Sequence, residues 1–454
     1  MSFEWPRKSL SELADVFTGF SFKGEKYLPS GTGIRVVRGD NVTEHSVRWG
    51  GKEKCWPTVT EELRPFLLRT GDVVIGMDGL KVGKNFAGIT LNDDGTLLAQ
   101  RVARVRARVG VNQDFIRYLI CNQQFTDYVQ SVHTGTSIPH ISKGQIQRFE
   151  VYAPPLQDQN WIASLLKALD DRITLLRETN ATLEAIAQAL FKSWFVDFDP
   201  VRAKLEGRIP EGMDEATAAL FPDGFEESEL GLVPRGWRLV PFGQLLSQTI
   251  GGDWGSDEPT ETNDTKVAII RGTDIPDLQS GANSRVPVRY TSQKKLATRR
   301  LEDGDIVLKV SGGSKDQPTG RALYLTNGIL NQFDCPVEPA SFCRLLRPNT
   351  KELGVLLGQH LIYIYAQGKT WEYQNQSTGI ANFQTTHFLA TELVAVPSNE
   401  VLVAFAAFVR STIDRMQLTQ VQDLATLRDT LLPRLISGQL RLPVTIEKAE
   451  ETVA

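Results

Sequence analysis

The sequence predicts an α+β fold in which two similar mixed α/β domains are separated by two long helices that form an antiparallel coiled coil. Two observations support this prediction. Short sequence motifs in the first half of the chain recur in the same order in the second half. Each repeat then ends in a helical pattern much longer than the average globular helix of about 11–12 residues.

The repeat begins at Trp5 and again at Trp237, and it defines domains at residues 1–155 and 237–397. A duplicated chain suits a duplicated partner, and a DNA duplex is a common partner with that symmetry. The returning words are Arg38-Gly39-Asp40-Asn41-Val42 as Arg271-Gly272-Thr273-Asp274-Ile275, Gly71-Asp72-Val73-Val74 as Gly304-Asp305-Ile306-Val307, and Ile138-Pro139-His140-Ile141 as Ile380-Ala381-Asn382-Phe383.

Inside each domain the sequence indicates strands and loops with few helices. Apolar runs at 73–75 and 306–308 follow Gly-Asp turns and predict buried strands. Apolar residues at helical spacing predict one helix at 114–129, with its counterpart at 355–366.

The first long helix is predicted at 156–198. Its apolar residues alternate steps of four and three over more than four heptads, which is the a/d seam of a coiled coil. The seam consists of Ile162, Leu166, Leu169, Ile173, Leu176, Asn180, Leu183, Ala187, Leu190 and Trp194.

The second long helix is predicted at 398–440, where one extra residue interrupts the heptad between Gln420 and Leu427. Pro433 should kink its last turn, and Gly438 suits its C-terminal cap. Its seam consists of Val409, Ile413, Met416, Gln420, Leu424, Leu427, Leu431 and Leu435.

Two long seams in one chain pair most simply with each other. The pair should be antiparallel because the first helix leads from one domain to the next. Asn180 and Gln420 lie near the midpoints of their seams, so we expect their amides to meet and fix the register of the coiled coil. The alternative is that each amide points to solvent.

The connector at 199–236 is rich in proline and acidic residues and predicts a mostly irregular segment, with one short helix at 213–220. The tail at 441–454 is predicted to be disordered. The excess of Asp and Glu over Lys and Arg is concentrated near the connector. Residues 196–236 hold 4 Lys and Arg against 10 Asp and Glu, whereas residues 1–155 hold 20 against 16 and residues 237–397 hold 16 against 16. The two domains therefore leave room for local basic surfaces despite the net charge of −4.

Composition excludes several classes of protein. The chain has no apolar run long enough to span a membrane and no signal-peptide pattern at its start, so we expect a cytoplasmic protein that does not contact a membrane. None of the four cysteines forms a CxxC pair, and the histidines form no HExxH word, so no metal site is expected.

Several further words complete the pattern. Gly71-Asp72-Val73-Val74-Ile75 is followed by Gly79-Leu80-Lys81-Val82-Gly83-Lys84, and Pro154-Pro155-Leu156-Gln157-Asp158-Gln159 opens the first helix. The two helices close on Leu190-Phe191-Lys192-Ser193-Trp194-Phe195 and on Leu431-Leu432-Pro433-Arg434-Leu435-Ile436-Ser437-Gly438. In this order, and over essentially the whole chain, the organisation resembles the specificity (S) subunit of type I restriction-modification enzymes. Pro397-Ser398-Asn399-Glu400 departs from the family pattern at the entrance to the second helix.

The resemblance implies a non-catalytic DNA-recognition subunit. Each domain would be a target-recognition domain that reads one half of a bipartite asymmetric site on double-stranded DNA. The helices would set the spacing of the half-sites and bind two methyltransferase (modification) subunits, and two restriction/translocase subunits would join that core. S-adenosylmethionine, ATP and Mg²⁺ would belong to those partners, and this chain would hold no cofactor.

The residues agree with a non-catalytic role. The motif around Gly79 and Gly83 differs from the phosphate-binding loop of an ATPase in two ways. Three residues separate its glycines, where the ATPase loop has four, and Asn85 stands where a magnesium-binding Ser or Thr is needed. No Ser/His/Asp arrangement and no Asn/Asp-Pro-Pro-aromatic methyltransferase word is recognised. An enzyme is therefore disfavoured.

Phosphate contacts from Lys and Arg give affinity, and side chains that reach base edges give specificity. Two duplicated loops are the best candidates, although ordinary solvated loops have the same composition. Arg104, Arg106 and Arg108 share one strand face, which fits either a DNA stripe or a solvated face. The loop candidates for DNA binding are Lys81, Lys84, Asn85, His140, Lys143, Ser314, Lys315, Arg321 and Asn382.

The helices also carry more aromatic residues than a two-helix pair can cover. These are either partner interfaces or are buried against the chain's own domains. They are Trp161, Phe191, Phe195 and Phe198. A helix of roughly 38 residues would be about 57 Å long, so half-site centres are expected on the order of 10–16 base pairs apart. The competing interpretation is a coiled-coil scaffold that displays two protein-binding modules without DNA.

Overall fold

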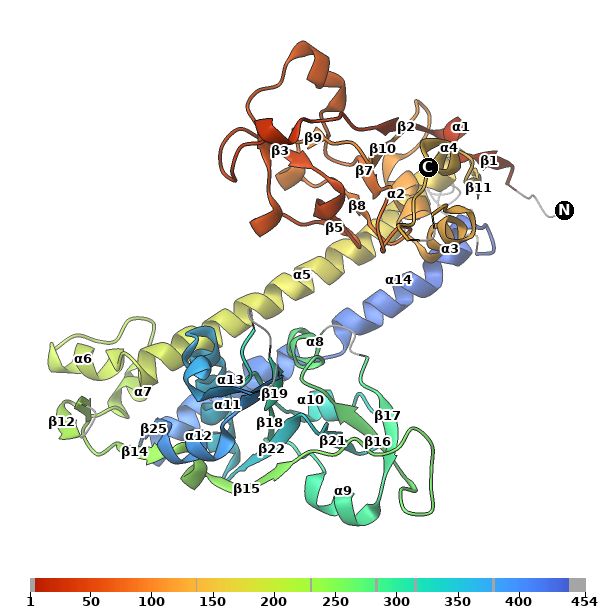
Figure 1. Ribbon diagram of the computed structural model, residues 1–454. Coiled ribbons are helices and arrows are strands. Elements are labelled where there is room, and N and C mark those ends of the chain that lie inside the picture. Colours follow the sequence, from red (N-terminus) through yellow and green to blue (C-terminus); the bar gives the residue numbers. More distant parts are fainter. Residues whose placement is uncertain are drawn as a thin grey trace, which may run out of the picture. The chain divides into compact units, whose positions relative to one another are not determined.

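The computed structural model describes residues 5–135, 137–228, 231–281, 285–313, 317–377 and 380–440, and the side chains of 376, 377 and 380 lie outside that description. The chain folds as two compact units (Figure 1). Unit 1 is Met1–Arg172 with Ala425–Ala454, and unit 2 is Ile173–Leu424. Each unit therefore combines one of the repeated domains with segments of the long helices. The predicted disordered tail, 441–454, lies outside the described residues.

Unit 1 is built on a four-stranded antiparallel sheet with two smaller sheets beside it. Its strands are β1 (Arg7–Ser9), β2 (Ala14–Thr18), β3 (Ile34–Val37), β4 (Val42–Thr43), β5 (Ser46–Val47), β6 (Cys55–Trp56), β7 (Val73–Gly76), β8 (Phe86–Gly88), β9 (Leu97–Leu98), β10 (Val102–Ala107) and β11 (Glu150–Tyr152). The main sheet has the order β2-β10-β7-β8, and the smaller sheets are β6-β3-β9 and β1-β11. A two-stranded pair, β4-β5, lies outside these sheets.

Unit 2 repeats the main sheet and the two smaller sheets of unit 1 and adds further strands. Its strands are β12 (Phe225–Ser228), β13 (Gly231–Pro234), β14 (Arg238–Pro241), β15 (Leu246–Gly251), β16 (Thr265–Ile270), β17 (Val288–Thr291), β18 (Ile306–Lys309), β19 (Ser311–Gly313), β20 (Ala322–Tyr324), β21 (Val337–Pro339), β22 (Cys343–Pro348), β23 (Gln374–Ser377), β24 (Ile380–Phe383) and β25 (Leu393–Val396). The order β15-β22-β18-β20 matches the main sheet of unit 1. The sheets β17-β16-β21 and β14-β25 match its smaller sheets, including the parallel pairing of β16 with β21 and of β3 with β9. The structure thus confirms the predicted duplication.

The aspartate of each Gly-Asp motif forms an ion pair in which the carboxylate is buried, and this shared role explains why the motif recurs. In unit 1 the Asp72 carboxylate accepts two hydrogen bonds from Arg106, both at 2.6 Å. In unit 2 Asp305 accepts two from Arg347, both at 2.8 Å. The aspartates are 2% and 3% exposed, whereas the arginines are 28% and 26% exposed. Each pair joins the turn before a central strand to the neighbouring strand of the same sheet.

The two arginines within β10, Arg104 and Arg106, are therefore structural rather than part of a DNA-binding or solvated face, whereas Arg108 follows the strand and is exposed. Arg104 is buried, its guanidinium lies over the Phe17 ring, and it pairs with Asp15 at 3.1 Å. Arg106 is bound to Asp72 as described, and Arg108 donates to the Ser11 carbonyl at 3.0 Å. The sequence showed the alternation but not these acceptors, which lie far away in the chain.

Helices cover the sheets of both units. In unit 1 they are α1 (Leu10–Leu13), α2 (Gln113–Ile120), α3 (Gln123–Val132) and α4 (Lys143–Gln147). The helix predicted at 114–129 is thus two helices. Asn122 separates them, since its side chain caps α3 by accepting a hydrogen bond from Phe125 N at 3.0 Å. In unit 2 the helices before the C-terminal pair are α6 (Asp199–Leu205), α7 (Glu215–Ala219), α8 (Ile275–Ser280), α9 (Gln293–Arg299), α10 (Asn327–Leu330), α11 (Lys351–Ala366) and α12 (Thr385–Thr391).

The first long helix, α5, spans Leu156–Phe195 and contains all ten predicted seam residues. None of these residues is exposed, so the heptad pattern marks the buried stripe of the helix. Its partners are α13 (Asn399–Met416) and α14 (Gln420–Ile436). In unit 1, Leu166 of α5 shares a core with Leu432 and Leu435 of α14.

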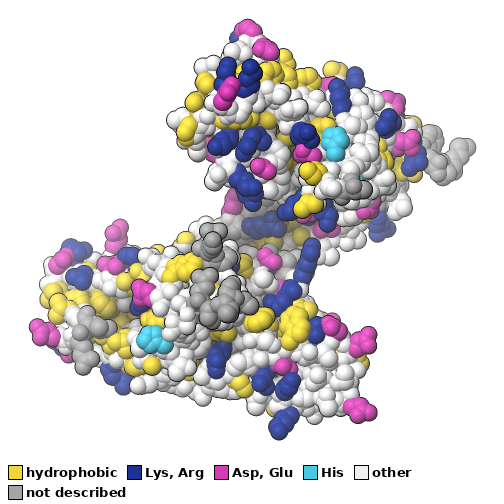
Figure 2. Space-filling view, in the orientation of Figure 1, with side chains coloured by type: hydrophobic (Ala, Val, Ile, Leu, Met, Phe, Trp, Pro, Cys, Tyr) yellow, Lys and Arg dark blue, Asp and Glu magenta, His cyan; other side chains and the backbone are white. Residues whose placement is uncertain are grey.

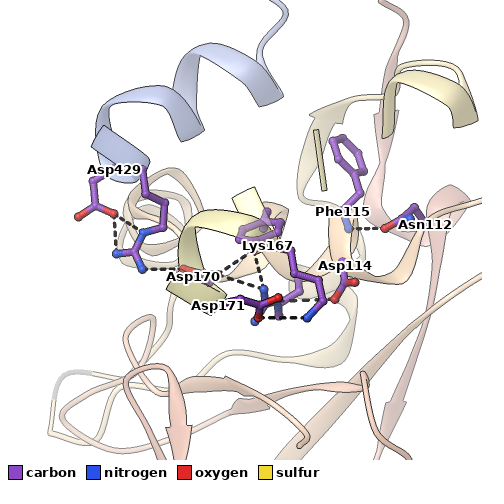
Figure 3. A network of polar contacts seen from close by, with 10 residues as sticks. Asn112, Asp114, Phe115, Lys167, Asp170, Asp171 and Asp429 are labelled. Atoms are coloured by element: carbon purple, nitrogen blue, oxygen red, sulfur yellow. Dashed lines mark hydrogen bonds and ion pairs between the residues drawn. The ribbon is translucent and has the colours of Figure 1, made fainter. Parts of the chain in front are cut away.

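Polar contacts reinforce this helix packing in unit 1 (Figure 3). Asp170 of α5 accepts a hydrogen bond from Arg428 of α14 at 2.9 Å. The same carboxylate accepts bonds from Arg117 at 3.1 Å and from the Tyr118 hydroxyl at 2.7 Å, both on α2. One carboxylate thereby links three helices of this unit.

The second long helix is broken, which corrects the prediction of one helix at 398–440. Residues Gln417, Leu418 and Thr419 separate α13 from α14. The Gln417 side chain is buried, donates to Tyr324 O at 2.9 Å and accepts from the Thr326 hydroxyl at 2.6 Å. Gly438, with a φ of +76°, follows the end of α14 as predicted.

The break also changes which side chains face inward. Gln420 and Leu427 of the predicted seam are exposed, whereas Val421 is buried and Arg428 is half-buried. Asn180 is buried as expected, but its Nδ2 donates to the carbonyls of Met416 and Ser280, both at 3.2 Å. The described residues contain no hydrogen bond between Asn180 and Gln420. The carbonyl that Asn180 binds ends α13, so the break itself supplies the partner for the amide.

The aromatic residues at the end of α5 form a core of unit 2 rather than an exposed patch. Phe191 and Phe195 are buried, and both pack against Phe405 of α13. Phe198 is half-buried, with its ring 5.8 Å from that of Trp237. Trp161, in unit 1, is half-buried against the core of that unit. The partner-interface interpretation of Phe191 and Phe195 is therefore wrong, because the chain's own domain covers them.

The connector is more ordered than predicted. It contains α6, α7 and the antiparallel pair β12-β13. Helix α7 lies inside the predicted range 213–220, and the Asp214 side chain caps it by accepting from Thr217 N at 2.9 Å. The described helices include none with the length and apolar character needed to cross a membrane.

A buried carboxylate ties three elements of unit 2 together. Glu392 accepts hydrogen bonds from His360 Nε2 at 2.8 Å, from Lys369 Nζ at 3.0 Å and from the Tyr373 hydroxyl at 2.6 Å. Burial by itself raises the pKa of Glu392, but His360, Lys369 and Tyr373 outweigh it and lower that pKa to about 2. The ionised carboxylate is thus favoured by folding.

Unit 2 should therefore lose stability in acid in a way that depends on Glu392. The pKa is lower in the folded state than its ordinary value of 4.5, so the stabilisation is present above about pH 4.5 and is lost as the pH falls toward 2. We expect the difference in unfolding free energy between wild type and Glu392→Gln to shrink by on the order of 3 kcal/mol over that range. Hydrogen exchange of the β25 amides would measure the free energy of unfolding at each pH. Glu400→Gln, at an exposed position, is the control. If the unfolding free energies of wild type and Glu392→Gln ran parallel with pH, the prediction would be contradicted.

Candidate nucleic-acid interface

In unit 1 the structure brings the two predicted DNA-binding loops together. The loop after β7 runs beside the segment that precedes α4. Gly79 N donates to Pro139 O at 3.1 Å, and Ile141 N donates to Met77 O at 2.8 Å. The ring Nδ1 of His140 also lies 3.1 Å from Met77 O. The lysines of the first loop and the histidine of the second therefore belong to one surface.

Unit 2 repeats the main-chain bond that joins the two loops. Phe383 N donates to Val310 O at 2.8 Å, as Ile141 does to Met77. Asn382, the counterpart of His140, accepts a hydrogen bond from the Ser311 hydroxyl at 2.8 Å. The same backbone frame thus presents histidine in one unit and asparagine in the other. Asparagine is a side chain suited to bidentate contacts with adenine.

The loop surface of unit 1 presents cations to solvent. Lys81, Lys84 and Lys143 are all exposed, and the described residues form no ion pair with them. Leu80 and Ile138, on the same two loops, are 90% and 64% exposed. Figure 2 shows Lys and Arg side chains gathered on the face of unit 1 that is in view. Unpaired lysines beside exposed apolar side chains suit contacts with phosphates and bases.

Asn85 does not belong to this exposed surface, which corrects its prediction as a DNA contact. It is 5% exposed. In the amide orientation that satisfies both of its polar atoms, its nitrogen donates to Gly76 O at 3.2 Å and to Lys81 O at 2.9 Å. The Asn85 amide thus closes the turn that displays Lys81 and Lys84. Its role is to position the loop.

In unit 2, Ser314 and Lys315 lie outside the described residues, and Arg321 is half-buried. The Arg321 guanidinium lies 5.1 Å from the centre of the Tyr365 ring. Its neighbour across the strands is Lys309, since Lys309 N donates to Arg321 O at 2.8 Å. Sequence reasoning missed Lys309, although aligning the two Gly-Asp words places it opposite Gly76 of the first repeat.

A further charged pair missed in the sequence lies beside His140. Asp78 is bridged to His140 through the backbone, and its carboxylate pairs with Arg101 at 2.9 Å. Arg101 has a φ of +66°, which is uncommon for a residue with a side chain. Its carbonyl accepts a hydrogen bond from Met77 N at 2.9 Å, so the backbone contact and the ion pair fix this conformation together.

The described residues contain no group of three or more His, Cys, Asp or Glu side chains arranged to hold a metal ion. They also contain free thiols at Cys55, Cys121, Cys335 and Cys343. Burial raises the pKa of Cys121 and of Cys343 to about 12, so these thiols are protonated at neutral pH and unsuited to nucleophilic chemistry.

Comparisons with known proteins identify relatives. The family model described as "Type I restriction modification DNA specificity domain" matches residues 3–185. The chain is 28% identical over 379 residues to the type I restriction enzyme HindI specificity subunit of Haemophilus influenzae, covering 72% of this chain and 77% of that protein. It is 22% identical over 340 residues to the MjaIX specificity subunit of Methanocaldococcus jannaschii, covering 73% and 70%.

The fold is also shared with a solved structure. The crystal structure of a type I restriction-modification system S subunit from M. genitalium superposes with a TM-score of 0.53 at 15% identity, and the match covers 98% of each chain. At that identity the likeness concerns the fold, which includes both repeats and the long helices.

Proposed function

The chain belongs to the family of type I restriction-modification specificity subunits, and from that premise we propose that each of its units reads one half of a bipartite asymmetric DNA site. Recognition of DNA sequence is the function of this family, and the chain itself is non-catalytic. The observation that carries the proposal is the duplicated pair of loops. An equivalent backbone bond joins the two loops in both units, but the loops present His140 in one and Asn382 in the other.

Different side chains on one frame give different half-sites. In unit 1, Lys81, Lys84 and Lys143 would contact phosphates and set the register of the domain on the duplex. His140 and Asn382 lie on the second loop of their units, beside the first loop, and are the candidates for contacts with base edges. The alternative of a scaffold that does not bind DNA receives no support from the comparisons.

The long helices would set the distance between the half-sites and bind two methyltransferase subunits. Surface side chains of unit 2 support the second role. Leu175 and Ile186 of α5 and Val403 and Phe408 of α13 are at least two-fifths exposed although apolar. A hollow of about 750 Å³ opens beside Phe408, between α5, α6 and α13. Exposed apolar side chains on these two helices suit a protein interface.

The remaining partners follow from the family. Two restriction/translocase subunits would join the complex of this chain with its methyltransferase subunits. S-adenosylmethionine would be bound by the methyltransferase subunits, and ATP and Mg²⁺ by the restriction subunits. This chain would contribute the choice of DNA sequence.

The test uses the complex of this chain with its methyltransferase subunits. Methylation of a DNA library should reveal one split, asymmetric motif. The double variant Lys81→Met and Lys84→Met should weaken binding to that motif without changing it. The plot of the logarithm of the binding constant against the logarithm of the salt concentration should become shallower by about 2. The reason is that each lysine removed would cost one phosphate contact. The control is Lys266→Met, an exposed lysine of unit 2 on β16. Methylation without sequence preference, or binding that does not depend on salt, would contradict the proposal.

A further inference from the structure

Two cations of unit 2 face each other, and the described residues provide no acidic partner for them. Lys309 ends β18 and Arg321 immediately precedes β20, continuing the antiparallel register in which Leu308 is paired with Ala322. Lys309 N donates to Arg321 O, and Gly320 N donates to Lys309 O, both at 2.8 Å. Like charges at facing positions of two strands destabilise a sheet.

Neighbouring groups hold both side chains in place. The stem of Lys309 packs on Gly272, where an added Cβ would lie only 2.6 Å from Lys309 Cγ. The Arg321 guanidinium lies over the Tyr365 ring. Both residues are half-buried and therefore remain reachable from solvent. The conformational entropy of two long side chains is thus already lost before any ligand arrives.

No counter-charge for the pair lies among the residues that the structure describes. Neither side chain takes part in an ion pair or a side-chain hydrogen bond within the described part of the chain. Burial, followed by the nearby charge of Arg321, lowers the pKa of Lys309. A bound anion would relieve the repulsion and accept hydrogen bonds from both residues. The planar fork of arginine with the point charge of lysine is suited to the oxygens of a phosphate.

Unit 1 has no such pair at the equivalent place. Gly76 N donates to Asn85 O at 2.8 Å, the bond that Lys309 makes with Arg321 in unit 2. There, however, the residues are a glycine and a buried amide. An added Cβ at Gly76 would lie 2.0 Å from an atom of the Asn85 amide group, so the space above the strand is filled. The duplicated units therefore differ by two positive charges at one position of a shared frame.

We propose that Lys309 and Arg321 together bind a backbone phosphate of the DNA that unit 2 recognises, at a position where unit 1 makes no charged contact. This proposal rests on the proposed function and deepens it. The frame places the pair next to the loops of unit 2, because Val310 follows Lys309 directly and its carbonyl binds Phe383 N. At this position unit 2 would then hold its half-site through a charged phosphate contact, whereas unit 1 would not.

The experiment compares Lys309→Met and Arg321→Gln in the complex with methyltransferase subunits, on a duplex that carries the methylated motif. Each variant should lower the slope of log binding constant against log salt by about 1 and weaken binding by about tenfold at fixed salt. The motif should stay the same. In the free chain the melting temperature of Lys309→Met should equal or exceed that of wild type, since the repulsion is gone. Lys266→Met is again the matched control.

Each outcome bears on the proposal separately. An unchanged slope in both variants, with wild type still binding its motif, would overturn the phosphate contact and leave the proposed function standing. Wild type that binds no DNA motif would overturn the function itself. A lower melting temperature for Lys309→Met would assign the pair a structural role. Stabilisation of wild type but not of the variants by inorganic phosphate, together with an unchanged DNA slope, would make this a site for free phosphate.

Discussion

Replacing Asp305 with alanine is expected to destabilise unit 2 by about 3–5 kcal/mol, the usual cost of removing one partner of a buried ion pair. The substitution leaves Arg347, which is only 26% exposed, without the carboxylate that accepts two of its hydrogen bonds. It also removes the acceptor of the Glu302 backbone N–H, which Asp305 binds at 2.7 Å. The first candidate loop of unit 2 follows β18, the strand that this turn begins. Recognition of DNA by unit 2 should therefore be lost when the unit is destabilised.

The duplication supplies an internal comparison. Asp72→Ala should have the same effect on unit 1, where Asp72 holds Arg106 and the backbone N–H of Arg69. Hydrogen exchange measured separately in β7 and β18 would show which unit opens. Asp223→Ala, from the exposed pair with Arg235, is the control and should change neither unit. A loss of less than about 1 kcal/mol in both aspartate variants would show that solvent replaces the carboxylates.

Lengthening the long helices is expected to change the sequence that the protein recognises. Helix α5 is 40 residues long, or about 60 Å at 1.5 Å per residue. Seven residues inserted after Arg172, with seven more before Ala425 in α14, would add about 10 Å to both helices. The spacer between the half-sites should grow by about three base pairs, while both half-sites stay the same.

Methylation mapping of the lengthened protein measures this directly. The same insertion in α5 alone is the control. It lengthens only one of the two paired helices and should abolish recognition, because the helix contacts of unit 1, such as Asp170 with Arg428, and those of unit 2, such as Asn180 with Met416, could not both be kept. An unchanged spacer after the double insertion would show that helix length does not set the spacing.

The sequence predicted what depends on local pattern. The ten-residue seam of α5 could be recognised because heptad spacing depends on the helix alone. The Gly-Asp words predicted turns before buried strands, and the repeats predicted which loops correspond. Met77 and Val310 indeed hold those loops by equivalent bonds.

What the sequence did not show depends on partners that are distant in the chain. Gln417 breaks the second helix through bonds to Tyr324 and Thr326, about ninety residues away. Phe405 covers Phe191 and Phe195, for which the sequence leaves a partner interface and burial against the chain's own domain as alternatives. Asn85 has the composition of a contact residue, but its amide is used to close a turn. Periodicity gives no information about such contacts.

The way in which the candidate loops are attached has an evolutionary consequence. The bonds that hold the second loop to the first in each unit run between main-chain atoms, as in Ile141 with Met77 and Phe383 with Val310. These main-chain bonds do not depend on which side chains stand at those positions, although Asn85 closes the first loop of unit 1 through its amide. Mutation or recombination there would alter what is read at little thermodynamic cost. A lineage under pressure from invading genomes would in this way diversify its targets while conserving the protein that carries them.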